Sequence, residues 1–476
     1  MMSLNRNAVA YAATTLAASS MNSVFFFYYV KLFLEKYGLS PAWFQWSQVV
    51  YMIWNAINDP LFGYLQDNSN WSLFRSRKKA IYYGAPIWAL TFLLPWFQWA
   101  DYTKPTNNWI IGLHLMFTLC AYDSLLTFVL LAQCALSAEI STKHEDRLQL
   151  VKYQQVASLL GTSSVLFSNL ISNNMEDFFS LQLYCVAIAI AACIFLRFSG
   201  ANVHTKYEAG DVSSTETLLS PNDGRISASG AILITKQILQ NRNFLAFVFM
   251  NFFQVFHTTF CSNFLLIFGS HLIPKNALPS IARSIVFGSS YMLPQLFVLL
   301  GGQVIRKLGA YRVVMCSFII QILAASTVYM IGPTITWSIA CFFVLDMCIP
   351  SAMFSLFNIL LSDIIDEDIK INNRKFPQSS MVFGTNALIT KPANSLAPML
   401  VVAVLNSYGY DHLKQYGSNW TEDEPNPDPF ELAKLHDVMF KLLCLLPIVL
   451  SVLQIVVWRF YNLRNTHKTE AKYTEA

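Results

Sequence analysis

Two charged residues lie inside long apolar stretches of this sequence: Asp59 within roughly 44–65 and Lys391 within roughly 381–405. Each stretch is long enough to cross the ~30 Å hydrocarbon core of a bilayer as a helix. An ionised side chain at the bilayer centre costs at least ~2.5–3.5 kcal/mol, so it normally faces a partner or a water-filled cavity. One acid and one base, placed this way in opposite halves of the chain, indicate a pathway for a solute or an ion.

Asp59 has polar neighbours at helical spacing. Asn55, Asn58 and Asp59 stand at i, i+3 and i+4, so a helix presents them on one face. Pro60 follows directly, removes one backbone N–H and leaves a carbonyl free near the acid. Such a face suits a cation or a hydrogen-bonding solute. The alternative is a buried acid that neighbouring amides satisfy and that takes no part in transport.

Lys391 has a similar setting in the second half. Asn394 shares its helix face, and Pro392 and Pro398 flank it. The pKa of a buried lysine shifts readily, so this amine could be a counter-ion, a proton carrier or a substitute for a bound cation. The alternative is a fixed charge that only pairs with an acid such as Asp59.

Other apolar stretches carry further candidate binding residues. Asp123 either lines the same cavity or lies near the membrane surface, and Asn251 and Gln254 share one face of a later stretch. His257, beside them, could titrate near neutral pH, although a hydrogen-bonded packing histidine is the alternative. The first apolar run carries a milder polar stripe of Thr15, Ser19, Asn22 and Ser23. This stripe is weak evidence for a binding site, because hydroxyls often bond to their own helix.

The composition predicts an all-α membrane protein. Hydrophobic residues make up 54% of the 476 residues and charged residues only 13%, which a soluble protein could not bury. In lipid the backbone must satisfy its own hydrogen bonds, so the spans must be helices. We expect about twelve transmembrane helices, at 8–32, 43–65, 80–100, 109–138, 150–172, 180–199, 243–270, 281–302, 313–332, 336–362, 379–406 and 436–458.

Several kinds of chemistry are disfavoured. The nine cysteines fall within the apolar runs and form no CxxC pair, so neither a disulfide framework nor a zinc site is expected. No glycine-rich phosphate loop, metal-spaced His/Glu set or nucleophile elbow occurs in the sequence. We therefore expect no enzyme, no cofactor other than Na⁺ or H⁺ as a coupling ion, and no nucleic-acid partner.

The distribution of Lys and Arg predicts the orientation. Most of them fall in the loops that are cytosolic if both termini are cytosolic. Asn419 begins an Asn-Trp-Thr glycosylation sequon in the 407–434 loop, which this topology places outside. We expect a multi-pass protein of the plasma membrane, with an endomembrane as the alternative.

The chain divides into two halves. Residues 200–240 are polar and predict a mobile cytosolic linker between an N-terminal six-helix bundle (1–199) and a C-terminal one (241–458), followed by a cytosolic tail (459–476). Two parallel repeats joined in this way suggest the major facilitator architecture, in which one bundle rocks against the other.

A short basic loop follows the second run of each half. A glycine precedes each loop, Gly63 in the first half and Gly302 in the second, and would allow helices to approach closely. Loop charges could hold the cytosolic side shut, although a merely solvated loop is the alternative. The expected gating residues are Asp67, Arg75 and Arg77 of the first of these loops, and Asp363, Asp366 and Arg374 at the inner end of the tenth run.

The segment Trp54-Asn55-Ala56-Ile57-Asn58-Asp59-Pro60, with Gly63, resembles the second-helix motif of melibiose permease and its relatives, the glycoside–pentoside–hexuronide cation symporters. The segment from Asp363 to Pro392 is similar to that of the transmembrane protein 180 group of the major facilitator superfamily. Asn55 stands where melibiose permease has a cation-site Asp, whereas Asp59 and Lys391 are retained.

The resemblance implies a solute carrier that works by alternating access, in contact with membrane lipid and as a monomer. Its cargo would be a small polar solute, moved with H⁺ or Na⁺. Lysolipid carriers are similar to the same family, so a lipid or lysolipid cargo is a second possibility. A membrane scaffold or sensor that transports nothing is a third.

Overall fold

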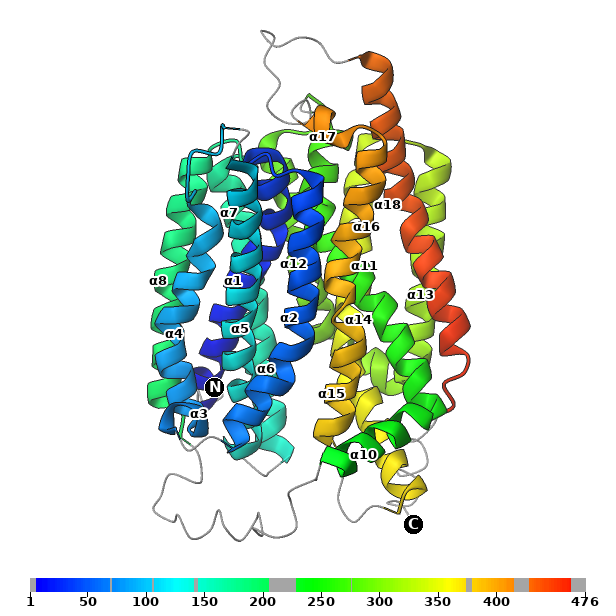
Figure 1. The fold of residues 1–476 in the computed structure, drawn as a ribbon. Helices are drawn as coiled ribbons and strands as arrows, with labels where there is room; N and C mark the ends of the chain where they lie inside the picture. The colour runs from blue at the N-terminus through cyan, green and yellow to red at the C-terminus, as the bar shows by residue number, and fades with distance from the viewer. Residues whose placement is uncertain are drawn as a thin grey trace.

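The described chain is helical and contains no strand, as the composition predicted. Figure 1 shows the early helices (blue to cyan) on one side of the molecule and the late helices (green to red) on the other. A computed structural model describes residues 6–68, 71–104, 107–140, 144–204, 228–274, 276–373, 379–414 and 428–463.

The first group of helices, here called the N-terminal group, packs around α1. Helix α1 contacts α6 and α8, while α4 contacts α5 and α8, and α2 lies against α5. The group comprises α1 (Arg6–Lys31), the π-helical turn η1 (Leu32–Lys36), α2 (Pro41–Asn68), α3 (Ser72–Arg75), α4 (Arg77–Leu93), the 3₁₀ turn η2 (Leu94–Trp96), α5 (Asn108–Ile140), α6 (His144–Thr162), α7 (Ser164–Ser172) and α8 (Phe178–Asn202).

The second group, the C-terminal group, packs around α11, which contacts α14, α16 and α18. The two groups meet where α1 lies against α11, α2 against α16, and α12 against α6 and α7. The group comprises α10 (Ala228–Gln240), α11 (Arg242–Leu272), α12 (Ser280–Leu308), α13 (Ala310–Ile331), α14 (Thr336–Ile371), α15 (Ser379–Thr390), α16 (Ala393–Ser407), α17 (Tyr410–Leu413) and α18 (Pro429–Trp458).

The outer surface suits a membrane. Large apolar side chains stand exposed on its helices, among them Leu183 and Ile194 of α8, Leu300 of α12 and Leu323 of α13. Among the described residues, 8 helical stretches are long and apolar enough to span a bilayer. They coincide with eight of the expected runs, and the other four runs form α1, α2, α4 with η2, and α6 with α7.

Two expected spans are broken. The run 150–172 forms α6 and α7, and the run 379–406 forms α15 and α16 with Lys391 and Pro392 between them. Pro392 lacks the N–H that a continuous helix would use. The backbone tightens instead, because the N–H of Asn394 bonds to the carbonyl of Lys391 at 3.0 Å. Lys391 therefore stands at a break and not inside a regular helix.

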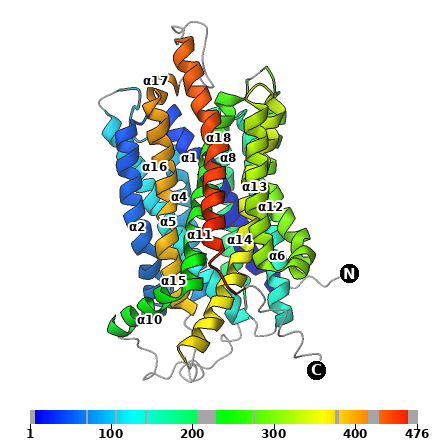
Figure 2. The ribbon, with the colours of Figure 1, turned by 90° about the vertical axis from the view of Figure 1, so that its right-hand side faces the viewer.

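The predicted linker is helical at both flanks. Helix α8 extends to Asn202 and α10 begins at Ala228, while residues 205–227 lie outside the described chain. Of the predicted tail, residues 459–463 are described. Helix α1 begins, and α8 and α18 end, at the same end of the molecule, as Figures 1 and 2 show.

Of the two glycines expected to allow close helix approach, the surroundings of Gly302 lie outside the described part of the chain, and close approach occurs at a glycine other than Gly63. A Cβ on Gly63 would meet nothing within 4 Å, so the prediction for that glycine is wrong. A Cβ on Gly161 of α6 would lie 2.6 Å from the Cβ of Ser19 and 2.9 Å from the carbonyl oxygen of Leu16. Gly161 therefore sets the distance between α6 and α1, the helix around which the N-terminal group packs.

Gly161→Ala is expected to lower the stability of the protein by about 1–3 kcal/mol, because the added methyl forces two helices apart. Gly301→Ala in α12 is the matched control, since its Cβ would meet nothing within 4 Å. That change should be neutral or slightly stabilising, because alanine favours helix by up to ~1 kcal/mol. Thermal unfolding of both variants in detergent measures the difference, and equal melting temperatures would contradict the assignment.

Candidate functional site

Asp59 and Lys391 form an ion pair that joins the two groups of helices. Asp59 comes from the middle of α2, and Lys391 from the break between α15 and α16. Their side chains are 26% and 23% exposed, so the pair is partly shielded but not sealed. The acid and base that the sequence singled out are thus brought together.

A line of hydrogen bonds leads from this pair to a second acid. The Thr127 hydroxyl donates to Asp59 at 3.1 Å, and the amide of Asn58 donates to Thr127 at 3.0 Å. The same amide donates to a carboxylate oxygen of Asp123 at 2.7 Å. Asp123 is only 7% exposed, and it is not among the residues that line the cavity described below. Two carboxylates therefore share one polar network in the N-terminal group.

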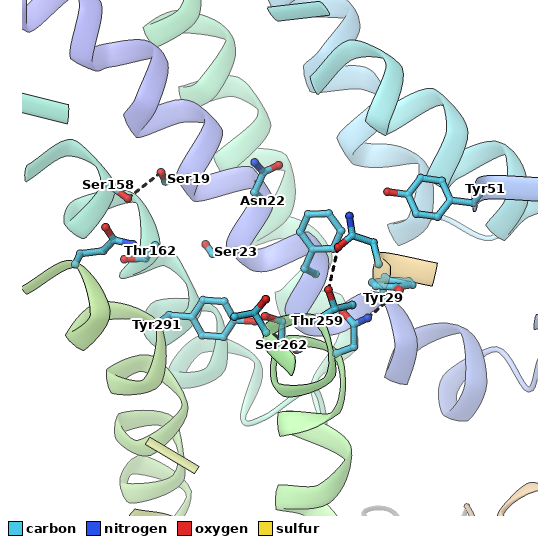
Figure 3. A pocket seen from close by; sticks show the side chains of 15 residues that line it. Ser19, Asn22, Ser23, Tyr29, Tyr51, Ser158, Thr162, Thr259, Ser262 and Tyr291 are labelled. Atoms are coloured by element: carbon cyan, nitrogen blue, oxygen red, sulfur yellow. Dashed lines mark hydrogen bonds between the residues drawn. The ribbon is translucent and has the colours of Figure 1, made fainter. Parts of the chain in front are cut away.

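A cavity of about 310 Å³ lies between the two groups, and Figure 3 shows its lining. Ser19, Asn22 and Tyr51 line it from the N-terminal group. Thr259 and Asn394 line it from the C-terminal group, where Thr259 donates to Asn394 at 2.9 Å. Its lining residues carry hydroxyls, amides and aromatic rings, and none is Asp, Glu, Lys, Arg or His.

Short links connect the cavity to the ion pair. The amide of Asn55 lies 3.5 Å from the hydroxyl of Tyr51, which lines the cavity, and one helical turn separates Asn55 from Asp59. Asn394 follows Lys391 by three residues and also lines the cavity. A solute in the cavity would therefore contact Tyr51 and Asn394, which lie close in the chain to Asp59 and Lys391.

A second polar cluster, here called the outer cluster, joins the groups where α1 ends. Glu35 in η1 accepts a hydrogen bond from Tyr410 at 2.9 Å and lies 3.5 Å from His271 of α11. Lys31 lies 3.6 Å from the other carboxylate oxygen of Glu35. The side chains of Lys31, Glu35 and His271 are 7% exposed or less. Sequence reasoning missed this cluster, because its members come from separate elements and show no shared spacing.

Three expected binding residues lie elsewhere, in the interior of the C-terminal group. Asn251 donates to Asn386 at 3.0 Å, and Gln254 donates to the carbonyl of Pro350 at 2.8 Å. His257 contacts Asp346 at 2.9 Å. The stripe judged weak in the sequence does line the cavity, through Ser19, Asn22 and Ser23.

The expected gating residues are only partly described. Arg77 donates to Gln66 at 3.1 Å within its own group. Asp363 is buried in α14, and Asp366 of the same helix is exposed. The side chains of Asp67 and Arg75 lie outside the described part of the chain, as do the whole of Arg374 and the sequon residue Asn419.

The sequence matches a known transporter family over most of its length. Residues 10–465 match the family described as MFS/sugar transport protein, so the chain belongs to that family. Its polytopic, all-helical fold is the expected one for this membership.

Curated relatives include transmembrane protein 180 of Gallus gallus, 31% identical over 96% of this chain and 92% of the relative. The Mus musculus protein of the same name is 30% identical over equal shares. A shorter match, 27% identical over 23% of this chain and 20% of the relative, is to the sodium-dependent lysophosphatidylcholine symporter 1 of Mus musculus.

Solved structures share the fold at low identity. The nucleoside transporter NupG has a TM-score of 0.59 at 15% identity, covering 96% of this chain and 100% of its own. A D-xylose-proton symporter has a TM-score of 0.55 at 13% identity, covering 96% of both chains. The chain is therefore similar in architecture to membrane transporters throughout its length.

Proposed function

We propose that this protein carries a small, uncharged polar solute across a membrane by alternating access, and that the Asp59–Lys391 pair couples transport to a cation. The observation that carries the proposal is a cavity lined by both helix groups beside an ion pair that joins them. A carrier of this class binds its solute between two halves that move against one another.

The lining indicates the kind of solute. Hydroxyl and amide groups hydrogen-bond neutral polar molecules, and aromatic rings such as Tyr29, Tyr51 and Tyr291 offer flat apolar faces. A volume of about 310 Å³ is at the lower end of the ~300–1,000 Å³ range of ligand pockets. A sugar, a nucleoside or a solute of similar size and polarity fits both features.

The ion pair supplies a route to coupling. A proton on Asp59, or a cation beside it, would weaken its attraction for Lys391 and release α2 from the α15–α16 break. Asn58 and Thr127 would then bridge Asp59 and Asp123, so that a charge change at one acid is felt at the other. Cation binding would thereby favour separation of the two groups.

The outer cluster lies where α1 ends, on the side of the molecule at which the two groups are closed against each other. Its contacts tie η1 of the N-terminal group to α11 and α17 of the C-terminal group. Nearby, the amide of Gln45 in α2 donates to the carbonyl of Met399 in α16 at 2.9 Å. Opening this side requires these contacts to break.

Glu35→Gln is expected to open this side more often, because a neutral amide oxygen is a weaker hydrogen-bond acceptor than a carboxylate for Tyr410 and His271 of the other group. A cysteine at Ser262, which lines the cavity, should then react several-fold faster with an impermeant maleimide applied from the Glu35 side. The protein that keeps Ser262 and all of its native cysteines gives the baseline rate of labelling. Glu431→Gln, at an exposed acid of α18, is the control, and equal rates in both variants would contradict the gate.

Uptake into proteoliposomes tests the proposed function. Purified protein would be reconstituted with a panel of radiolabelled hexoses, pentoses, nucleosides and charged metabolites, with and without imposed H⁺ or Na⁺ gradients. We expect uptake of a neutral member, increased by one gradient. Absence of uptake for every neutral solute, under either gradient, would overturn the proposal.

A lysolipid carrier is the second candidate, favoured by the short match to the lysophosphatidylcholine symporter. Labelled lysophosphatidylcholine belongs in the same panel for this reason. Competition by lysolipids but not by small polar solutes would select the second candidate and reject the first.

A further inference from the structure

A cluster of possible metal ligands lies in the interior of the C-terminal group. Nε2 of His257 is 2.9 Å from one carboxylate oxygen of Asp346, and Sγ of Cys261 is 3.3 Å from the other. One ligand atom from each of the three residues lies within 4.8 Å of the others. His257, Cys261 and Asp346 are 1%, 6% and 2% exposed. None of them lines the cavity of about 310 Å³.

The fold brings these residues together for a simple reason. His257 and Cys261 are four residues apart on α11, so they share one face of that helix. Asp346 comes from α14, which packs against α11. Imidazole nitrogen, thiolate sulfur and carboxylate oxygen together form a donor set that suits Zn²⁺. No zinc site was expected from the sequence, since Asp346 is distant in the chain and the pair on α11 matches no zinc motif.

The charges of the donor set also favour a divalent cation. The described partners of Asp346 are the side chains of His257, Cys261 and Gln321. A buried carboxylate without a cation is costly. A divalent cation held by one carboxylate, one thiolate and one neutral imidazole makes a site with no net charge.

A fourth ligand is available from α13. The amide nitrogen of Gln321 donates to Asp346 at 2.5 Å, and its amide oxygen is buried without a hydrogen-bond partner among the described residues. Rotation of the amide about its terminal torsion would turn that oxygen toward the cluster.

We propose that His257, Cys261 and Asp346, with Gln321 as the fourth ligand, form a structural zinc site. Binding releases the thiol proton of Cys261 to solvent and leaves the thiolate on the metal. The site ties α11 to α13 and α14 and leaves no open position for a substrate. Thr258, Thr259 and Ser262 of α11 line the transport cavity, so the metal would also fix the face that they present.

Metal analysis of the full-length protein in detergent, without added metal, tests the site directly. We expect near-stoichiometric zinc in the wild type and a large loss in Cys261→Ser and in His257→Gln. Cys185→Ser is the matched control, because Cys185 is a buried cysteine of the N-terminal group. Zinc at background level in the wild type, or equal zinc in all four proteins, would overturn the proposal.

Cobalt substitution gives a second readout, which is made on the wild-type protein. Wild-type protein exchanged with Co²⁺ should show the near-ultraviolet absorption of a cobalt–thiolate bond, and Cys185→Ser should retain it. A spectrum without that absorption overturns the proposal and leaves a hydrogen-bonded His257–Asp346 pair instead. Neither measurement depends on uptake, so failure of the zinc site and failure of the proposed transport function are separate results.

Discussion

Asp59→Asn and Lys391→Met are each expected to reduce solute uptake by at least ~10-fold while the protein still reaches the membrane. Each change leaves one charge of the pair without its partner at the junction of the two helix groups. Breaking a fully buried pair costs ~3–5 kcal/mol, and a pair about a quarter exposed costs less, so a loss of about 1–3 kcal/mol in stability is also expected.

The double variant Asp59→Asn/Lys391→Met separates coupling from stability. Without either charge the unpaired-charge penalty disappears, so its melting temperature should recover above that of both single variants. Uptake should not recover, because no group remains to respond to the cation. Thermal unfolding and proteoliposome uptake measure the two effects. Normal uptake by the double variant would show that the ion pair is not required for transport.

The sequence predicted candidate site residues best where a charged residue stands inside an apolar stretch. Asp59 and Lys391 stand out because an ionised side chain in lipid has a high free energy. Such a residue therefore predicts an ion-pair partner or a water-filled cavity. The spacing of Asn55, Asn58 and Asp59 correctly placed them on one helix. It did not reveal that Asn58 binds Asp123, because a single sequence does not encode which helices are neighbours.

The outer cluster and the cavity lining show where sequence reasoning ends. Glu35, His271 and Tyr410 are ordinary residues near the ends of three separate elements, and only the packing of α1 against α11 brings them together. Hydroxyls such as Ser19 are ambiguous in sequence, since they can bond to their own helix. Here the side chain of Ser19 donates to Ser158 of α6 at 3.3 Å and lines the cavity.

Ser158→Phe is expected to abolish uptake by filling the cavity. Ser158 lines the cavity from α6, and a phenyl ring there would occupy much of the space for a solute within about 310 Å³. The steric loss should be at least ~10-fold, since exclusion from the site removes all the binding energy that a solute gains there. Uptake and solute-induced stabilisation should be lost together, because both require the solute to enter the cavity.

Leu160→Phe on the same helix is the matched control. Leu160 is 59% exposed and lines an apolar hollow between α1, α6 and α8, so a larger apolar side chain there does not enter the cavity of about 310 Å³. That variant should retain wild-type uptake and the wild-type response of its melting temperature to solute. The two changes introduce the same side chain two residues apart on α6. A difference in uptake between them therefore reflects the filling of the cavity and not a general effect of a phenyl ring on α6. Equal uptake by both variants would show that the solute passes elsewhere, even if the ion pair proved essential.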